Sequence, residues 1–221
     1  MTDLKLVLFD CDGTLADSHG FLTNMVESAF RHVGADLPPP ELMREFYSLH
    51  FDEFFRRCDK HISPEQIVAA SEFMRVRLRT ERETGATTEP FYKGIHDALE
   101  TLKADGYLMG IVTNKGGHGL KLVLASNKAT DYFITLHHSD NSVTKPSPDM
   151  VLNAIEATGV DPEKCIVVGD SVIDISTANN ARVRSIGVTW AGRDAEALKN
   201  AGAVNVIGDV AELVPAIRAI L

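Results

Sequence analysis

The chain has little of what marks an exported or membrane protein. It holds three cysteines in 221 residues, an odd number with no metal-ligand spacing, so Cys11, Cys58 and Cys165 are expected to be reduced, mostly buried thiols. No apolar run is long enough to span a membrane, and the N-terminus lacks the basic segment and apolar stretch of a secretory signal. A cytoplasmic protein with no membrane partner is therefore expected.

Positive charge is also scarce. The chain has 22 Lys and Arg against 31 Asp and Glu, a formal net charge of −9 at pH 7. This balance disfavours a general polyanion binder, so nucleic acid is not expected as a partner. It remains compatible with a small phosphorylated metabolite, because a single site can be locally positive.

Hydrophobic residues make up 44% of the chain, enough to bury the interior of one large domain or of a core with a smaller one. From about Ser18 to Thr88 the apolar residues recur at helical spacing, with no convincing strand. Within this segment the prolines at 38–40 break the chain, and Pro64 begins a long helix. The segment is interpreted as a helical bundle inserted between two parts of one core.

From Pro90 onward, short apolar strands alternate with helices. Strands are expected over 107–113, near 132–136, and over 165–169, 184–189 and 203–207. Helices are expected after Lys93 and Gly116, from Pro148, Ile173 and Ala195, and near 210–220. The alternation predicts an α/β fold with a parallel sheet covered on both faces. Ligands of such sheets bind beyond the carboxyl ends of the strands.

The first expected strand, LVLF at 6–9, runs directly into two acids. Side chains alternate along an extended chain, so Asp10 and Asp12 share one face. Two unit charges ~4 Å apart cost roughly 4 kcal/mol at an effective dielectric of about 20, so the pair requires a shared proton or a nearby cation. Gly13 and Thr14 follow as a tight turn whose N–H groups and hydroxyl are suited to an anion.

Other expected strands also end on polar residues. These residues are Thr113, Asn114, Lys115, Asp170 and Asp174, with Lys145 in a loop held by Pro146 and Pro148. Phosphoryl transfer needs this set, because a carboxylate that attacks a phosphate dianion requires Mg²⁺, a fixed cation and hydrogen-bond donors. Oxygen-only ligands suit Mg²⁺ and not zinc. The GGHG stretch lacks the spacing of a P-loop, so a nucleotide-hydrolysing Walker site is not expected.

Four motifs in this order, DCDGTLADS, VTN, TKPSPD and VVGDSVID, closely resemble the haloacid dehalogenase-like superfamily. Within it the chain resembles phosphatases of the phosphoglycolate phosphatase type. The resemblance implies a Rossmann-like core formed by residues 1–16 and 89–221, with a small α-helical cap over 17–88. It also implies a Mg²⁺-dependent enzyme that hydrolyses a small phosphate monoester, with phosphoglycolate as the leading substrate.

The resemblance assigns a role to each residue of the motifs. Asp10 is implied as the nucleophile that forms an aspartyl-phosphate. Asp12 is implied to protonate the leaving oxygen and then to activate water. Thr113 and Asn114 are implied to bind phosphate oxygens, and Lys145 to neutralise the nucleophile and the phosphate.

The same resemblance implies a Mg²⁺ site. The ion would be held by the Asp10 side chain, the Asp12 backbone carbonyl and Asp170. Asp174 would assist directly or through water. The competing interpretation for Asp174 is an acid on a helix surface.

Other functions of this superfamily compete with a phosphatase. Dehalogenases lack the second acid, so Asp12 argues against them, and phosphonate hydrolases need a cap lysine, for which the segment offers only Lys60. A sugar-phosphate phosphatase or a hexose-phosphate mutase keeps both acids and stays open. A non-catalytic binding protein of this superfamily is expected to have lost part of the acid set, which is intact here. The oligomeric state is not readable from the sequence.

Some residues near these motifs are given no role. The three histidines His118, His137 and His138 are expected at the surface or in loops, and Trp190 and Arg193 are expected to pack a loop.

The stretch YSLHFDEFFRRCDKH in the expected cap is rich in aromatic and basic residues. If the substrate carries a carboxylate beside its phosphate, Arg56 or Arg57 is the first candidate to bind it, since a guanidinium binds carboxylates in a bidentate way. The competing interpretation is a solvated helix face, because adjacent helical residues point about 100° apart. The role of His50 stays open.

Overall fold

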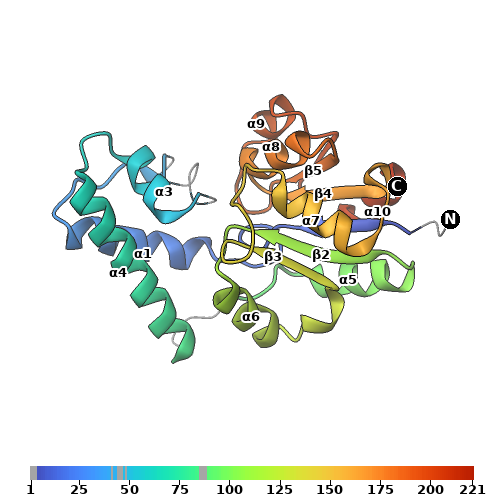
Figure 1. Cartoon of the computed structure of the whole chain (residues 1–221), viewed down its shortest axis with the longest axis horizontal. Coiled ribbons are helices and arrows are strands. Elements are labelled where there is room, and N and C mark those ends of the chain that lie inside the picture. Colours follow the sequence, from blue (N-terminus) through green and yellow to red (C-terminus); the bar gives the residue numbers. More distant parts are fainter. Residues whose placement is uncertain (1–3, 41, 44–46, 48, 85–88) are drawn as a thin grey trace. The chain divides into compact units, whose positions relative to one another are not determined.

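The computed structural model describes residues 4–40, 42–43, 47, 49–84 and 89–221 (Figure 1). The chain divides into two compact units: unit 1 is Met1–Asp17 with Glu89–Leu221, and unit 2 is Ser18–Thr88. Each unit has its own apolar core. Among the residues that the structure describes, none of the helices combines the length and the apolar character needed to cross a lipid bilayer.

Unit 1 is built on a sheet of six parallel strands in the order β3-β2-β1-β4-β5-β6. The strands are β1 Leu6–Phe9, β2 Leu108–Thr113, β3 Thr135–His138, β4 Cys165–Gly169, β5 Arg184–Val188 and β6 Asn205–Ile207. β1 pairs with β2 on one side and with β4 on the other, so Phe9 lies opposite both Ile111 and Val168. The carboxyl ends of these three strands therefore lie side by side.

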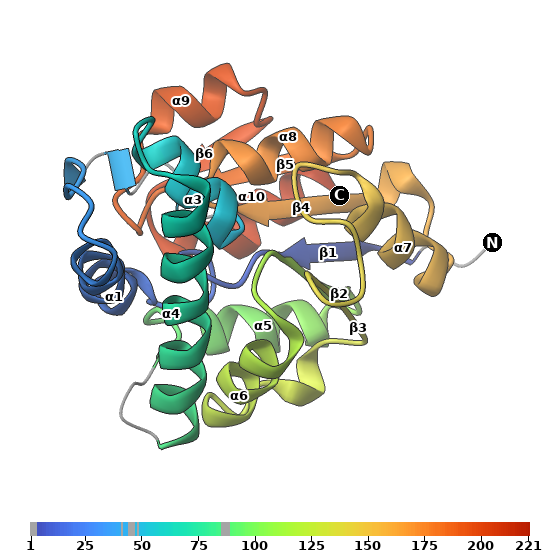
Figure 2. The ribbon, with the colours of Figure 1, turned by 60° about the vertical axis from the view of Figure 1, so that its left-hand side comes forward.

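Helices cover both faces of this sheet (Figures 1 and 2). They are α5 Ile95–Ala104, α6 Gly117–Ser126, α7 Asp149–Thr158, α8 Val172–Asn180, α9 Ala195–Asn200 and α10 Leu213–Ile220. Along β1, Phe9 packs into a core with Leu99 of α5, whereas Leu8 packs into a second core with Val151 of α7. Alternate residues of β1 are thus buried on opposite faces of the sheet. Because both faces are covered, every residue of β1 is apolar. The predicted α/β class is confirmed.

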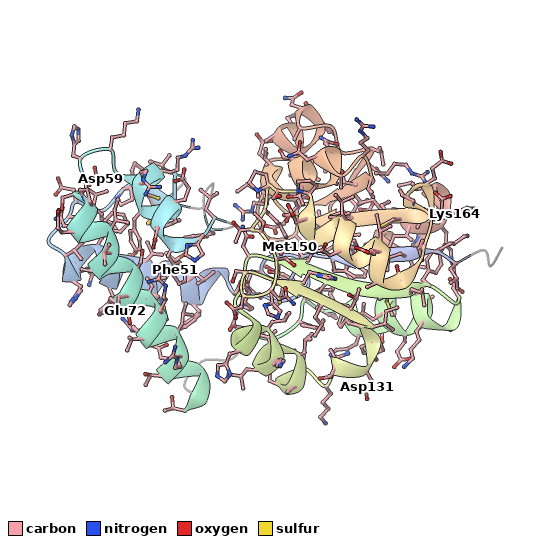
Figure 3. The ribbon with its side chains drawn as sticks, in the orientation of Figure 1. Phe51, Asp59, Glu72, Asp131, Met150 and Lys164 are labelled. Carbon is pink, nitrogen blue, oxygen red and sulfur yellow. The ribbon has the colours of Figure 1, made fainter. Side chains whose placement is uncertain are left out.

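Unit 2 contains α1 His19–His32, α3 Phe51–Cys58 and α4 Pro64–Glu83 among its described residues. Phe30, Phe54 and Phe55 form the centre of its core, with the rings of Phe30 and Phe55 5.2 Å apart. α4 begins at Pro64, whose fixed φ and missing N–H suit the first helical position. Met150 in unit 1 is buried, whereas Glu72 in unit 2 and Asp131 in unit 1 are exposed (Figure 3).

One expected element is displaced. The strand expected near 132–136 begins at Thr135 and extends to His138, and residues Thr130–Tyr132 form a 3-10 turn. Phe133 follows this turn and packs against Phe9 in the core, edge to face with ring centroids 6.3 Å apart. An apolar residue that is buried by packing on a core, and not by strand pairing, produces the same sequence pattern as a strand.

Candidate active site

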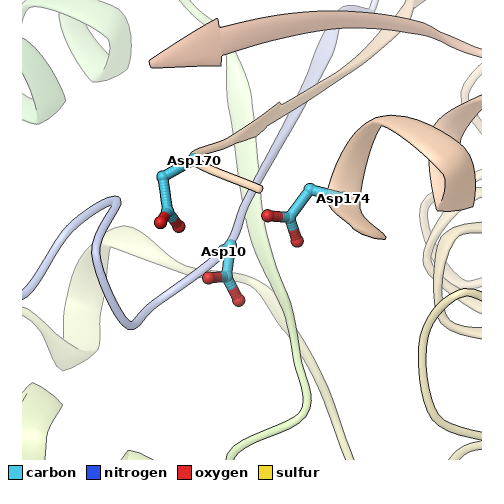
Figure 4. A group of neighbouring side chains, drawn as sticks. All are labelled: Asp10, Asp170 and Asp174. Carbon is cyan, nitrogen blue, oxygen red and sulfur yellow. The ribbon is translucent and has the colours of Figure 1, made fainter. Parts of the chain in front are cut away.

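Two strand ends and the start of a helix bring acids together at one edge of the sheet. Asp10 follows β1, Asp170 follows β4, and Asp174 lies in the first turn of α8. All three side chains are buried, and one carboxylate oxygen from each lies within 4.8 Å of the others (Figure 4). A buried, oxygen-only set of this kind fits Mg²⁺, a hard cation that takes carboxylate ligands.

Lys145 lies between two of these acids. Its Nζ donates to Asp10 Oδ1 at 2.7 Å and to Asp174 Oδ1 at 2.6 Å. The lysine itself is buried in the loop between β3 and α7, and its backbone N–H donates to Asn114 Oδ1 at 2.8 Å. A buried ammonium that bridges two buried carboxylates offsets part of their mutual repulsion.

The charges around Asp10 do not balance. Burial, helped by the neighbouring carboxylates of Asp174 and Asp170, raises the pKa of Asp10 to about 7 against the opposing effect of Lys145. For Lys145, burial alone would lower the pKa, but the carboxylates of Asp10 and Asp174 outweigh burial and the net shift is upward. The three carboxylates of Asp10, Asp170 and Asp174 contact two cations, Lys145 and Arg193, so this cluster is suited to an additional cation.

Thr14 and Arg193 both donate hydrogen bonds to Asp170. Thr14 Oγ1 donates to Asp170 Oδ1 at 3.2 Å, and Arg193 Nε donates to Asp170 Oδ2 at 2.6 Å. Trp190 Nε1 donates to the backbone oxygen of Thr14 at 3.1 Å, so the loop after β5 supports both partners of this carboxylate. Arg193 and Trp190 were expected only to pack that loop. The available signal was their position after the carboxyl end of a strand.

Asp174 is held by the start of its own helix. Ser171 caps α8, and its backbone N and its Oγ donate to Asp174 Oδ2 at 3.0 and 2.6 Å. The side chain of Asp174 is fully buried. The competing interpretation of this residue as a helix-surface acid is therefore wrong.

Asp12 lies outside the buried cluster. Its side chain is 25% exposed, and Lys115 Nζ donates to Asp12 Oδ1 at 2.7 Å. Gly13, with φ of +83°, follows it and turns the chain, and the N–H of Gly13 donates to the backbone oxygen of Ala16 at 2.9 Å. The first two acids of the motif therefore have different cationic partners.

The residues at the end of β2 fix the local backbone. Thr113 is buried, and its Oγ1 accepts a hydrogen bond from the backbone N of Lys115 at 3.2 Å. The Asn114 side chain accepts from the Lys145 backbone N and donates to the Lys145 backbone oxygen at 3.4 Å. Asn114 was expected to bind phosphate, but its side-chain amide contacts the loop that carries Lys145.

Lys115 has a second partner that the sequence did not indicate. Its Nζ also donates to Oε2 of the buried Glu89 at 2.7 Å. Glu89 is the first residue of unit 1 after the inserted segment. Nothing in the local pattern around Glu89 marks it as a buried acid, because its partner is 26 positions away.

The cysteines are buried, and the histidines near the motifs differ in exposure. Cys11, Cys58 and Cys165 are buried and form no disulfide, as expected. Burial raises the pKa of the Cys11 thiol well above its usual value, so this residue between the two acids is a neutral thiol. His118 is exposed, whereas His137 and His138, expected at the surface or in loops, are half-buried on the edge strand β3.

The two arginines of α3 already contact a carboxylate. Arg57 Nε donates to Glu53 Oε1 at 2.8 Å, and Arg56 pairs with Glu53 Oε2. Both guanidinium side chains are largely exposed, at 59% and 61% for Arg56 and Arg57. This arrangement agrees with the solvated helix face that was the competing interpretation.

Comparison with known proteins identifies the class. The family model described as haloacid dehalogenase-like hydrolase matches residues 7–188. The chain is 26% identical to a pyrophosphatase, PpaX, of Oceanobacillus iheyensis, over 96% of this chain and 95% of that protein. It is 29% identical to phosphoglycolate phosphatase 1 of Pseudomonas aeruginosa, over 96% of this chain and 79% of that protein.

Solved structures share the fold. A crystal structure described as a predicted phosphatase from Clostridium acetobutylicum superposes with a TM-score of 0.86 at 26% identity, covering 98% of this chain and 99% of the other. A haloacid dehalogenase-like protein from Bacteroides fragilis superposes with a TM-score of 0.86 at 23% identity, covering 95% and 99%. The chain belongs to the haloacid dehalogenase-like hydrolases, and its relatives include named phosphatases.

Proposed function

We propose that the chain is a Mg²⁺-dependent phosphatase that hydrolyses a small phosphate monoester through an aspartyl-phosphate on Asp10. The observation that carries this proposal is the position of Asp10, a buried carboxylate beside the Lys145 ammonium and within one cluster with Asp170 and Asp174. A carboxylate fixed at a strand end next to a cation is suited to attack a phosphorus atom.

In the proposed reaction, one Asp10 oxygen attacks phosphorus and the bond from phosphorus to the leaving oxygen breaks. Asp12 donates a proton to that oxygen, then takes a proton from the water that hydrolyses the aspartyl-phosphate. Lys145 offsets charge on Asp10, and Thr113 lies at the neighbouring strand end to orient phosphate oxygens. Asn114 holds the Lys145 loop in place.

Asp10, Asp170 and Asp174 would hold the Mg²⁺, with the Asp12 backbone carbonyl as a further ligand. Bound there, the ion would offset negative charge on the phosphoryl group. Lys145 already occupies one oxygen each of Asp10 and Asp174, and the donors on Asp170 come from Thr14 and Arg193. These bonds orient the carboxylates, as outer contacts of metal ligands do.

For the substrate, we propose phosphoglycolate first, because a phosphoglycolate phosphatase is 29% identical over 96% of this chain. The pairing of Arg56 and Arg57 with Glu53 adds nothing to that choice. Inorganic pyrophosphate is a second candidate, because pyrophosphatases are among the relatives of similar length. Sugar phosphates stay as further alternatives. We expect a small phosphorylated metabolite as the partner and a cytoplasmic location.

The test is a screen of the purified protein with Mg²⁺ on phosphoglycolate, sugar phosphates, nucleoside monophosphates and pyrophosphate, ranked by kcat/KM. Asp10→Asn should abolish turnover with an unchanged circular dichroism spectrum, because the amide matches the acid in shape but does not attack phosphorus. Asp161→Asn, at an exposed turn, is the matched control and should keep full activity. Near-wild-type turnover by Asp10→Asn would remove the proposed nucleophile.

A further inference from the structure

A buried ion pair adjoins the candidate acid–base residue and has no part in the proposed chemistry so far. Lys115 Nζ lies 2.7 Å from Asp12 Oδ1 and 2.7 Å from Glu89 Oε2. The Lys115 and Glu89 side chains are 3% and 2% exposed, whereas that of Asp12 is 25% exposed. A buried ammonium thus joins a buried carboxylate to one that is accessible to solvent.

The backbone holds both members of the pair in place. Lys115 follows β2, where its N–H donates to Thr113 Oγ1 at 3.2 Å and its carbonyl accepts from Ser139 N at 3.3 Å. On the other side, Asn127 Nδ2 donates to the Glu89 backbone oxygen at 2.9 Å, and Asn127 Oδ1 accepts from Phe91 N at 2.8 Å. The ammonium is therefore fixed before any substrate binds.

Stability alone does not account for this arrangement. Removing two charges from water is unfavourable, and apolar side chains of similar volume commonly stabilise a fold as well as a buried ion pair does. The pair provides a fixed N–H donor to Asp12 Oδ1, which apolar residues would not provide. That bond restricts rotation of the Asp12 carboxylate, and a carboxylate transfers one proton through one oxygen.

We propose that Lys115, held by Glu89, is a positioning residue for Asp12 that orients its carboxylate for proton transfer to the leaving oxygen and from water. This inference rests on the proposed phosphatase function. In the first step the Asp12 proton moves to the departing alkoxide as its bond to phosphorus breaks. In the second step a water proton returns to Asp12 as the water oxygen bonds to phosphorus.

A positioning role predicts a dependence on the leaving group. An aryl ester with an acidic phenol, p-nitrophenyl phosphate, needs little protonation of its leaving oxygen, whereas benzyl phosphate, of similar size, releases a basic alkoxide. Because general acid–base catalysis contributes about 10²–10⁴-fold, Lys115→Met should lower kcat/KM on benzyl phosphate by roughly tenfold to a hundredfold. The loss on p-nitrophenyl phosphate should stay below about threefold.

Further variants separate positioning from folding. Lys115→Arg should recover part of the kcat/KM that is lost on benzyl phosphate. Glu89→Gln should lower the ratio of kcat/KM on benzyl phosphate to kcat/KM on p-nitrophenyl phosphate, as Lys115→Met does. Lys199→Met, at an exposed lysine that pairs with Glu196, is the matched control and should leave both substrates unaffected. If Lys115→Met does not fold, the double variant Lys115→Met with Glu89→Gln removes both charges of the pair and should show the same selective loss.

The outcomes separate this inference from the function on which it rests. An active wild-type enzyme whose variants lose activity equally on both esters, or on neither, would overturn the positioning role alone. A wild-type protein inactive on every phosphate ester would overturn the proposed function, and the positioning role with it. Selective loss on benzyl phosphate, with partial recovery in Lys115→Arg, supports the role.

Discussion

At the scale of single residues, each acid of the candidate site contacts a cation. Lys145 contacts Asp10 and Asp174, Arg193 contacts Asp170, and Lys115 contacts Asp12. Two buried carboxylates thus share one ammonium, and burial raises the pKa of Asp10 to about 7. An excess of negative charge of this kind is relieved when a divalent cation binds.

We therefore expect Mg²⁺ to stabilise the folded protein. A ligand that binds only the native state at 100 times its Kd adds about 2.7 kcal/mol to the free energy of unfolding. For a chain of this length that is an increase of several degrees in Tm, since about 1 kcal/mol corresponds to roughly 2–4 °C. Differential scanning fluorimetry with and without Mg²⁺ measures the shift.

The Mg²⁺-induced shift should be much smaller in Asp170→Asn, which removes one candidate ligand. Asp161→Asn, outside the cluster, should keep the wild-type shift. Comparing the shifts, and not the absolute Tm values, separates metal binding from the stability lost when Arg193 loses its partner. A wild-type Tm that does not respond to Mg²⁺ would contradict the assignment of this cluster.

At the scale of elements, only glycine fits at residue 169, where the turn from β4 into α8 begins. A Cβ added to Gly169 would lie 2.3 Å from Asp174 Cβ and 2.5 Å from its Cγ. The close approach exists because the first turn of α8 folds back over the strand end, where Ser171 caps the helix and contacts Asp174. The glycine thus allows a helix residue to reach the end of a strand.

Gly169→Ala should therefore displace Asp174, lower activity and destabilise unit 1. Overpacking of a well-packed site costs typically about 1–3 kcal/mol. The matched control is Gly208→Ala, whose added Cβ would have Thr189 Oγ1 at 3.7 Å as its nearest neighbour, so its effect should stay within about 0.5 kcal/mol. Urea unfolding monitored by circular dichroism gives the free energy of unfolding of both variants. Equal stabilities for the two variants would refute this account of the turn.

The buried strands were predictable from the sequence. The runs LVLF and CIVVG predicted buried parallel strands because both faces of such strands are covered. Because ligands of parallel sheets bind beyond the carboxyl ends of the strands, the polar residues at those ends were expected at one edge, where the structure brings Asp10, Asp170 and Asp174 together. The start of β3 was misplaced, because Phe133 is buried by packing outside the strand.

The contacts that the sequence did not reveal join residues far apart in the chain. Lys115 and Asp12 are separated by 103 positions, and Arg193 and Asp170 by 23 positions. A single charged residue after a strand has the same local signature whether it is solvated or buried against an acid. Only the packed fold distinguishes the two cases, so Lys115, Glu89 and Arg193 required the structure.

At the scale of the whole molecule, the described residues of the two units form cores that share no buried residue. The core of unit 2 includes Phe30, Phe54 and Phe55, all from the inserted segment, and the cores of unit 1 draw on residues before and after it. Separate cores permit separate unfolding, since cooperative units of a protein open with their own free energies. A large cavity in one unit should therefore leave the backbone amides of the other unit protected from hydrogen exchange.

We expect Phe55→Ala to loosen unit 2 alone. Phe55 is fully buried with its ring 5.2 Å from the rings of both Phe30 and Phe54, and removing such a side chain costs about 3–5 kcal/mol. Hydrogen exchange followed by mass spectrometry should accelerate in α1, α3 and α4, while β1 and β4 exchange at wild-type rates. Val68→Ala on α4, at an exposed position, is the matched control and should change neither unit. Faster exchange in β1 and β4 of Phe55→Ala would instead mean that the two cores unfold as one, because a single cooperative transition transmits the cavity to every strand.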